Sequence, residues 1–393
     1  MESIITLKNW IMKEETRQYA DINLIASENY SYPMVRKIVG SCLSHKYSEG
    51  TVGKRYYAGN KFIDLIEEDC KETVLELFNA KNDYIANVQP LSGTDANLSV
   101  FYAVTKIRGK KEIRILSLDL SCGGHLSHGN KNTFTNDFFI VKNYYVNKET
   151  QLLDYDEIRS IALEFKPDLI ISGASAYPRI IDFNKFNDVA MEVGALHLAD
   201  IAHIAGLCCS GYHPSPVGVS DFIAFTTHKT LRGPRGAVIL CRKEFEKQLN
   251  SAVFPGLHGG PHNNVVAAKS YCFKVNVDNS YKEYVSNVIN NAKVMSREFI
   301  NRGYKVITGG TDNHLLLVDI KGSIGIDGRE AQELLEENNI IVNANSIPFD
   351  TSPPYRPSGI RLGSPFMTAL DYKEQDFVKI VEEIDYILRG VQK

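Results

Sequence analysis

Short apolar runs recur along the first two thirds of the chain and alternate with longer amphipathic stretches. The runs are rich in Ile, Leu, Val and Phe and hold few charges, which is typical of strands covered on both faces. They predict strands at Ile113 to Leu120, Asp168 to Gly173, Ala195 to Asp200, Asp221 to Thr226 and Ala237 to Cys241. The stretches between them predict helices at Ala96 to Ile107, Tyr155 to Phe165 and Phe183 to Val193. This alternation favours a mainly parallel α/β sheet.

The pattern changes after Pro261, where the alternation of short strands and helices stops. The remaining chain predicts a long helical stretch (about Asn263 to Arg302), an apolar run (Leu315 to Ile320), a helix from Asp327, a short apolar run (Ile340 to Asn343) and an amphipathic helix (Lys373 to Arg389). We interpret this part as a smaller α+β domain packed on the first.

Composition narrows the class of protein. Of the 393 residues 44% are hydrophobic, which supplies a sizeable core and excludes a mainly disordered chain. The 44 Lys+Arg nearly balance the 47 Asp+Glu, so charge indicates neither a nucleic acid nor a membrane as partner. No apolar run approaches the roughly 18 residues of a membrane helix, and Met1 to Lys8 lacks the basic region of a secretion signal. The seven cysteines show no metal-type spacing, so we expect a reducing, cytoplasmic environment.

A lysine, Lys229, stands just where one apolar strand is predicted to end, before a turn rich in Gly and Pro. Ligand sites in open α/β sheets lie beyond the carboxyl ends of strands. A partly desolvated lysine there can lose its proton and form a Schiff base with a carbonyl. Taken alone, the lysine is better interpreted as a solvated surface residue, as most lysines are, and only its neighbours favour a catalytic role.

Asp200 ends another predicted strand, and His203 follows three residues later. A carboxylate in that place could pair with the protonated ring nitrogen of a pyridoxal cofactor. The alternatives are a helix N-cap for the aspartate and a buried, hydrogen-bonded histidine.

Ser92, Gly93 and Thr94 precede a predicted helix, where backbone N–H groups and the helix dipole suit a phosphate, although the same residues form ordinary caps. After another strand, Gly124 allows close backbone approach to a ligand, and His125 could lie flat on an aromatic ring. Metal binding by His125 with His128 is disfavoured because no third ligand stands nearby, and we expect no metal.

Two further segments carry candidate chemistry. Residues 45–59 combine three tyrosines with Glu49, the one acid there placed for proton transfer. Tyrosine clusters also occur in interfaces and cores. Arg361 lies between small residues and could grip a substrate carboxylate in a bidentate way, or form a structural salt bridge.

Together these segments resemble the serine hydroxymethyltransferases, pyridoxal-phosphate enzymes with the aspartate-aminotransferase fold (fold type I). The resemblance covers about Asn23 to Gly363 and rests on ordered motifs: Tyr47 to Gly59, Asn87 to Pro90, Gly123 to Gly129, Ser175 to Arg179, Asp200 to Gly206, Thr226 to Gly236, Phe254 to Gly256, Gly259 to Pro261 and Thr311 to His314. It implies a large domain with a mainly parallel seven-stranded sheet and a smaller α+β C-terminal domain. We place an N-terminal arm at residues 1–25, the cofactor-binding domain at 26–262 and the small domain at 263–393.

The family's cofactor site maps onto this sequence residue by residue. Lys229 matches the lysine that bonds pyridoxal 5'-phosphate, Asp200 matches the partner of the pyridinium nitrogen, and His125 matches the stacking histidine. The other matches are Ser175 and His203 at the ring oxygen, Ser92, Gly93 and Thr94 at the phosphate, and Tyr47 and Gly260, which reach the phosphate from the other subunit. Shared sites imply a homodimer.

The resemblance also assigns the substrate and co-substrate sites. Ser27, Tyr57 and Arg361 match the substrate contacts, and Arg235 lines the site. The matches to the tetrahydrofolate site are Glu49, Tyr56, Leu120, Gly124, Leu126 and Asn345. We expect Lys229, Glu49, Tyr57 and His228 to be the catalytic residues.

The chain departs from the family pattern at several positions that border the cofactor or folate region, and none of them is catalytic: Leu91, Asp95, Cys122, His258, Ala344 and Phe366. The leading interpretation is a tetrahydrofolate-dependent enzyme that interconverts serine and glycine. The departures leave open a paralogue that acts on another β-hydroxy or α-methyl amino acid. A non-catalytic scaffold is disfavoured because the whole catalytic set survives.

Overall fold

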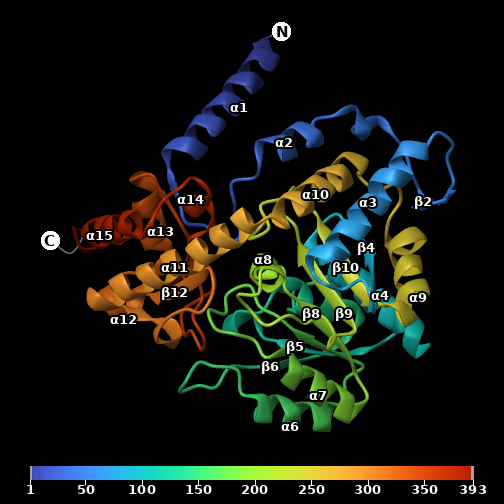
Figure 1. Ribbon diagram of the computed structural model, residues 1–393. Coiled ribbons are helices and arrows are strands. Elements are labelled where there is room, and N and C mark those ends of the chain that lie inside the picture. Colours follow the sequence, from blue (N-terminus) through green and yellow to red (C-terminus); the bar gives the residue numbers. More distant parts are fainter. Residues whose placement is uncertain (1, 391–393) are drawn as a thin grey trace.

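A seven-stranded sheet forms the centre of the larger part of the molecule (Figure 1). The computed structural model describes residues 2–390; Met1 and residues 391–393, at the ends of the expected arm and small domain, lie outside it. The strand order is β4-β10-β9-β8-β7-β5-β6, with β10 antiparallel to both neighbours and the pairs from β9 to β6 parallel. The strands are β4 (Tyr84–Asn87), β5 (Arg114–Leu118), β6 (Ile140–Tyr144), β7 (Leu169–Ser172), β8 (Leu196–Asp200), β9 (Phe222–Thr226) and β10 (Ala237–Arg242). The predicted α/β class with a mainly parallel seven-stranded sheet is confirmed.

Helices cover both faces of this sheet, which is why its central strands are largely apolar. Along β7, Leu169 and Ile171 face one core together with α4, while Ile170 faces the other core. The helices around the sheet are α3 (Lys61–Leu77), α4 (Gly93–Arg108), α5 (Phe134–Phe138), α6 (Tyr155–Phe165), α7 (Phe183–Val193), α8 (Ala205–Cys209), α9 (Glu246–Ser251) and α10 (Asn263–Asn276). The predicted helices within α4, α6 and α7 are confirmed.

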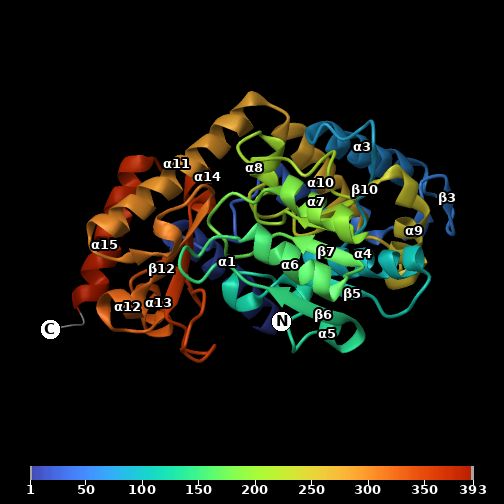
Figure 2. The ribbon, with the colours of Figure 1, turned by 90° about the horizontal axis from the view of Figure 1, so that it is seen from below.

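A second, smaller sheet is antiparallel and has its own core, formed with helices on its flank (orange and red in Figures 1 and 2). Its strand order is β11-β12-β15-β14. The elements of this part are β11 (Lys305–Val306), β12 (Leu315–Asp319), α12 (Ile320–Ile324), α13 (Gly328–Glu337), β13 (Ile340–Ile341), β14 (Asn343–Asn345), β15 (Gly359–Gly363), α14 (Pro365–Ala369) and α15 (Glu374–Gly390).

The single long helix predicted from Asn263 to Arg302 is wrong, because the chain breaks it into α10 and α11 (Asn279–Asn301). Asp278 caps the second helix, since its carboxylate accepts the N–H of Ser280 at 2.8 Å. The first half of α11 packs in the core of the large sheet, and its second half packs in the core of the small one. One helix therefore joins the two parts.

The N-terminal segments lie beside the two sheets, and of their described residues only the stretch around Leu24 is buried in the core of the small one. Helix α1 (Glu2–Ala20) projects from the body in Figure 1, and its described side chains are exposed, Trp10 and Met12 at 63% each. β1 (Ile22–Asn23) then pairs in parallel with β13, followed by α2 (Pro33–Val39) and the hairpin of β2 (Gly50–Thr51) and β3 (Lys54–Arg55). Across residues 2–390 no helix combines the length and the apolar character needed to cross a membrane.

Candidate active site

Lys229 follows the carboxyl end of β9 by three residues and is only 8% exposed. Asn29 fixes its backbone, because the Nδ2 amide of Asn29 donates to the Lys229 carbonyl at 2.7 Å. Burial lowers the pKa of the Lys229 ammonium to about 8, against the opposing pull of the Asp200 carboxylate. With a pKa of about 8 roughly a tenth of the amine is unprotonated at pH 7, far more than for an ordinary lysine, and the neutral amine is the form that attacks a carbonyl.

Asp200 ends the neighbouring strand β8 and is held by donors on three sides. Its Oδ2 accepts from Asn97 Nδ2 and lies against His128 Nε2, both at 2.8 Å, and its Oδ1 accepts from the Ala202 N–H at 3.0 Å. Burial alone would raise the pKa of this carboxyl, but the hydrogen bond and charge of His128 hold the pKa below its usual value. The group is a fixed carboxylate that could keep a ring nitrogen protonated.

His125 belongs to the same hydrogen-bonded chain. Its Nδ1 accepts from the Ser127 N–H at 3.2 Å and lies 2.8 Å from the Ser127 hydroxyl, which accepts from Asn97 at 2.9 Å. Burial lowers the pKa of His125 to about 4, so the ring is neutral at physiological pH. The neutral ring is oriented by its backbone and could stack on an aromatic cofactor.

Arg361 reaches the site from β15 of the small sheet. Its Nη1 donates to the Ser175 carbonyl at 2.8 Å, and its Nε donates to Asn343 Oδ1 at 3.1 Å. Burial lowers its pKa to about 10, which leaves the guanidinium charged. The charges of Lys229 and Arg361 also depress the pKa of His125 and His203, so these groups lie within electrostatic reach of one another.

His203 is buried and pairs with a histidine of the small part of the molecule. Its Nδ1 lies 3.3 Å from His314 Nε2, and the two rings stack with centroids 5.5 Å apart. Burial holds the pKa of both rings low, to about 3 for His314, so both are neutral. The pair joins the two sheets behind the site.

Ser92 is the N-cap of α4, and its hydroxyl accepts the Asp95 N–H at 3.3 Å. Gly93 packs against β9, where a Cβ atom would lie 2.9 Å from Thr226 Cγ2. Within the described residues the N–H groups of Gly93 and Thr94 donate to no acceptor. Free N–H groups at the positive end of a 16-residue helix fit a phosphate.

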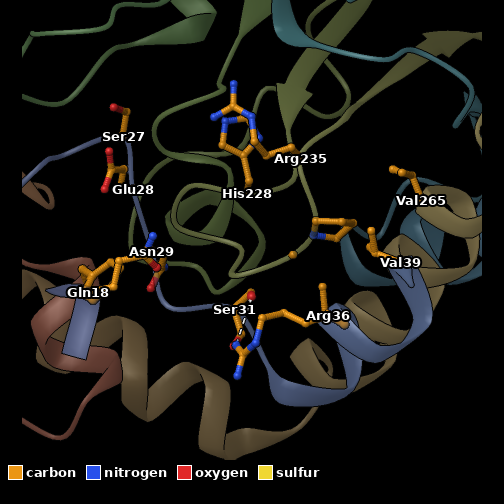
Figure 3. A pocket seen from close by; sticks show the side chains of 14 residues that line it. Gln18, Ser27, Glu28, Asn29, Ser31, Arg36, Val39, His228, Arg235 and Val265 are labelled. Atoms are coloured by element: carbon orange, nitrogen blue, oxygen red, sulfur yellow. Dashed lines mark hydrogen bonds between the residues drawn. The ribbon is translucent and has the colours of Figure 1, made fainter. Parts of the chain in front are cut away.

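A cavity of about 490 Å³ is lined by three more of the expected residues, Ser27, His228 and Arg235, although Lys229 itself does not line it (Figure 3). Figure 3 shows Ser27 on one side and His228 with Arg235 on the other. Burial, with the charges of Lys229 and Arg235, lowers the pKa of His228 to about 3, so this ring too is neutral.

The tyrosines of residues 45–59 form a second group of contacts. Within residues 2–390 no hydrogen bond, ion pair or ring contact joins this group to Lys229. The Tyr47 ring lies 5.2 Å from that of Tyr57 and packs on Gly260, where a Cβ atom would meet Tyr47 Cε1 at 3.0 Å. Glu49 Oε1 borders Gly259 in the same way at 3.2 Å. Tyr47, Tyr56 and Tyr57 are 53%, 74% and 49% exposed.

Four of the six expected folate residues lie on two loops that approach each other, and the other two, Glu49 and Tyr56, belong to the segment 45–59. Leu120 and Leu126 are exposed on the loop after β5, where a Cβ atom at Gly124 would lie 2.1 Å from the Leu118 carbonyl. Asn345 ends β14, and the loop beyond it contacts the first loop, since the Phe349 backbone bonds the Cys122 thiol.

Sequence reasoning missed Asn97 and His314 as site residues and considered His128 only as a metal ligand. The described residues include no group of three metal-ligating side chains. His128 instead orders Asp200. The sequence could have predicted Asn97 as a site residue, because it lies one turn into the helix whose N-terminus is the expected phosphate site.

A comparison with protein-family models finds one match, to the serine hydroxymethyltransferase family, and it covers residues 3–384.

Proposed function

Because the chain belongs to the serine hydroxymethyltransferase family, whose members are pyridoxal-phosphate-dependent transferases of serine and glycine, we propose that it transfers the hydroxymethyl group of serine to tetrahydrofolate. The products are glycine and 5,10-methylenetetrahydrofolate, and the reaction is reversible. The observation that carries the proposal is the meeting of a buried amine, Lys229, with Asp200, His125 and Arg361.

The residues present fit pyridoxal 5'-phosphate. Lys229 would hold its aldehyde, Asp200 its ring nitrogen, and His125 the face of its ring. Ser175 and His203 would lie at its ring oxygen, and Ser92, Gly93 and Thr94 would hold its phosphate. When bound, the cofactor supplies an electron sink for the bond that breaks at the amino-acid α-carbon.

The chain's own residues would bind and orient the substrate. The Arg361 guanidinium is charged and already held by Asn343, so it is oriented to bind the serine carboxylate. Ser27 and Tyr57 would complete that contact. His228 lies beside Lys229 as a neutral ring, which adds no second positive charge next to the amine.

Tetrahydrofolate would bind between the two loops that carry Leu120, Gly124, Leu126 and Asn345, with Glu49 and Tyr56. Proton transfer at the serine hydroxyl and at the folate nitrogen requires a positioned carboxyl group. We assign that role to Glu49.

We further propose a cytoplasmic homodimer in which each subunit completes the other's site. Tyr47, Tyr56 and Tyr57 are 49–74% exposed, and Tyr47 and Glu49 contact the loop of Gly259 and Gly260. Within residues 2–390 no hydrogen bond, ion pair or ring contact joins them to Lys229 of their own chain. The exposed apolar side chains of α1 supply further surface for a second copy.

Glu49→Gln tests the proposal, because it keeps the shape of the side chain and removes its titration. We expect normal serine binding and a loss of folate-dependent serine cleavage of about 10²–10⁴-fold. Cleavage of a bulkier β-hydroxy amino acid without folate should suffer far less. The measurement is aldehyde release with and without tetrahydrofolate: formaldehyde equivalents from serine and α-methylserine, and acetaldehyde from threonine.

Full folate-dependent activity in Glu49→Gln would remove Glu49 from the proton-transfer step. A wild-type preference for α-methylserine or threonine would favour the paralogue, to which the departures at Leu91, Asp95 and His258 also point. Equal loss of thermal stability and of both activities would show that Glu49 only shapes its loop.

A further inference from the structure

Two of the departures from the family pattern, Asp95 and His258, contact each other. His258 Nε2 forms a hydrogen bond with Asp95 Oδ1, and the side chains of His258 and Asp95 are only 5% and 20% exposed. They lie 163 positions apart in the sequence, so only the fold brings them together.

The pair lies at the first turn of α4, where we place the cofactor phosphate. Asp95 is the third residue of the helix, a position from which a carboxylate commonly accepts the free N–H groups of the first turn. A carboxylate that did so here would compete with the phosphate for Gly93 and Thr94 and would repel its charge.

The observed geometry avoids this competition. Asp95 Oδ2 accepts the N–H of Leu91 at 2.7 Å, which lies outside the helix, and Oδ1 is taken by His258. Both oxygens are thus held away from Gly93 and Thr94, whose N–H groups donate to no acceptor in the described part of the chain.

The loop before the helix is fixed from the other side. Lys269 is 1% exposed, and its Nζ donates to the carbonyls of Val88, Pro90 and Ala237 at 2.7–3.0 Å. With that loop held, the direction of the Asp95 carboxylate depends on His258.

We propose that His258 is a positioning residue for the cofactor phosphate: its hydrogen bond holds the Asp95 carboxylate in place, and so keeps the first turn of α4 open to the phosphate. This inference rests on the proposed function, because it assumes pyridoxal phosphate in this site.

The test is a thermodynamic cycle on the cofactor-free full-length protein, titrated with pyridoxal phosphate and, separately, with pyridoxal. His258→Ala should weaken pyridoxal phosphate binding about tenfold, because a carboxylate is set free beside the phosphate. Asp95→Asn combined with His258→Ala should restore the affinity to within about threefold of wild type, because no carboxylate remains to compete. Pyridoxal, which lacks the phosphate, should bind all four corners of the cycle alike: wild type, His258→Ala, Asp95→Asn and the double variant.

Glu192→Gln is the matched control. It removes an ion pair with Arg159 between α6 and α7, which does not involve the N-terminus of α4. Unchanged pyridoxal phosphate affinity in His258→Ala, or a double variant as weak as the single one, would overturn the inference. A parallel loss of pyridoxal affinity would overturn it too, because it would show general damage. Failure of the wild type to bind either compound would instead refute the proposed function itself.

Discussion

At the scale of single residues, the site depends on groups whose charge is set by burial. Lys229 is a weakened base, Asp200 a strengthened acid, and the histidines at positions 125, 203 and 228 are neutral. Sequence alone could place Lys229 and Asp200 at strand ends, but it could not show these charge states, which depend on neighbours such as His128 and Arg361 from distant segments.

The low pKa of Lys229 predicts how the cofactor-free protein reacts with pyridoxal phosphate. The neutral amine is the reactive form, so the rate should rise with pH and level off above about 8. Stopped-flow absorbance between pH 6 and pH 11 measures it, with Lys229→Ala as the control. A midpoint at the ordinary lysine value of 10.5 would show that the amine is solvated.

Arg361→Lys should weaken serine binding by about tenfold or more, because an ammonium replaces a forked donor and a charged hydrogen bond is worth roughly 1.5–3 kcal/mol. Titration of the cofactor spectrum with serine gives the affinity. The spectrum without serine should stay as in wild type, and Lys379→Met on the exposed face of α15 serves as the control. Unchanged serine affinity would place the carboxylate elsewhere.

At the scale of elements, α4 combines two duties. Its N-terminus forms the expected phosphate site. One turn later, the side-chain amide of Asn97 donates hydrogen bonds to both Asp200 and Ser127. The central strands were predictable because apolar residues fill both faces of β7, β8 and β9. The two strands that the pattern missed, β4 and β6, are the edges of the sheet. β4 has four residues, and β6 carries Lys142 and Asn143 at its open edge, so neither forms an apolar run.

Asn97→Leu tests the second duty of α4. The change removes a donor from a buried carboxylate, so the free energy of unfolding at pH 7 should fall by about 1.5–3 kcal/mol. Because the folded-state pKa of Asp200 lies below 3.8, the loss should shrink as the pH falls below that value. Urea unfolding measures both effects. The exposed Lys106→Met on the same helix should change stability by less than about 0.5 kcal/mol.

At the scale of the whole molecule, the site is built where the two sheets meet, and part of the expected set lies elsewhere on the same chain. Arg179 links the two parts of the molecule through an ion pair with Asp312 and two hydrogen bonds to Thr308. Tyr47 is 53% exposed, and it lies with the half-buried Glu49 against Gly259 and Gly260 instead. The motifs name the candidate residues, but their order in the sequence does not show which of them contact one another.

Hybrid dimers test this division. Tyr47→Ala and Lys229→Ala should each be inactive alone, yet a hybrid would contain one site with both residues intact. After subunit exchange in equal amounts, about a quarter of wild-type activity should return. Mass spectrometry of the mixture verifies the exchange. Exchange without any recovered activity would mean that each chain completes its own site.

Helix α11 has a further consequence for how far the molecule can be divided. Its first half supplies Tyr281 and Val285 to one core, and its second half supplies Met295 and Phe299 to the other. A cut before the helix would remove its first half from the core of the large sheet. A cut after it would remove its second half from the core of the small sheet. Although the chain reads as two domains, no single cleavage point separates it into two parts that each keep a complete interior.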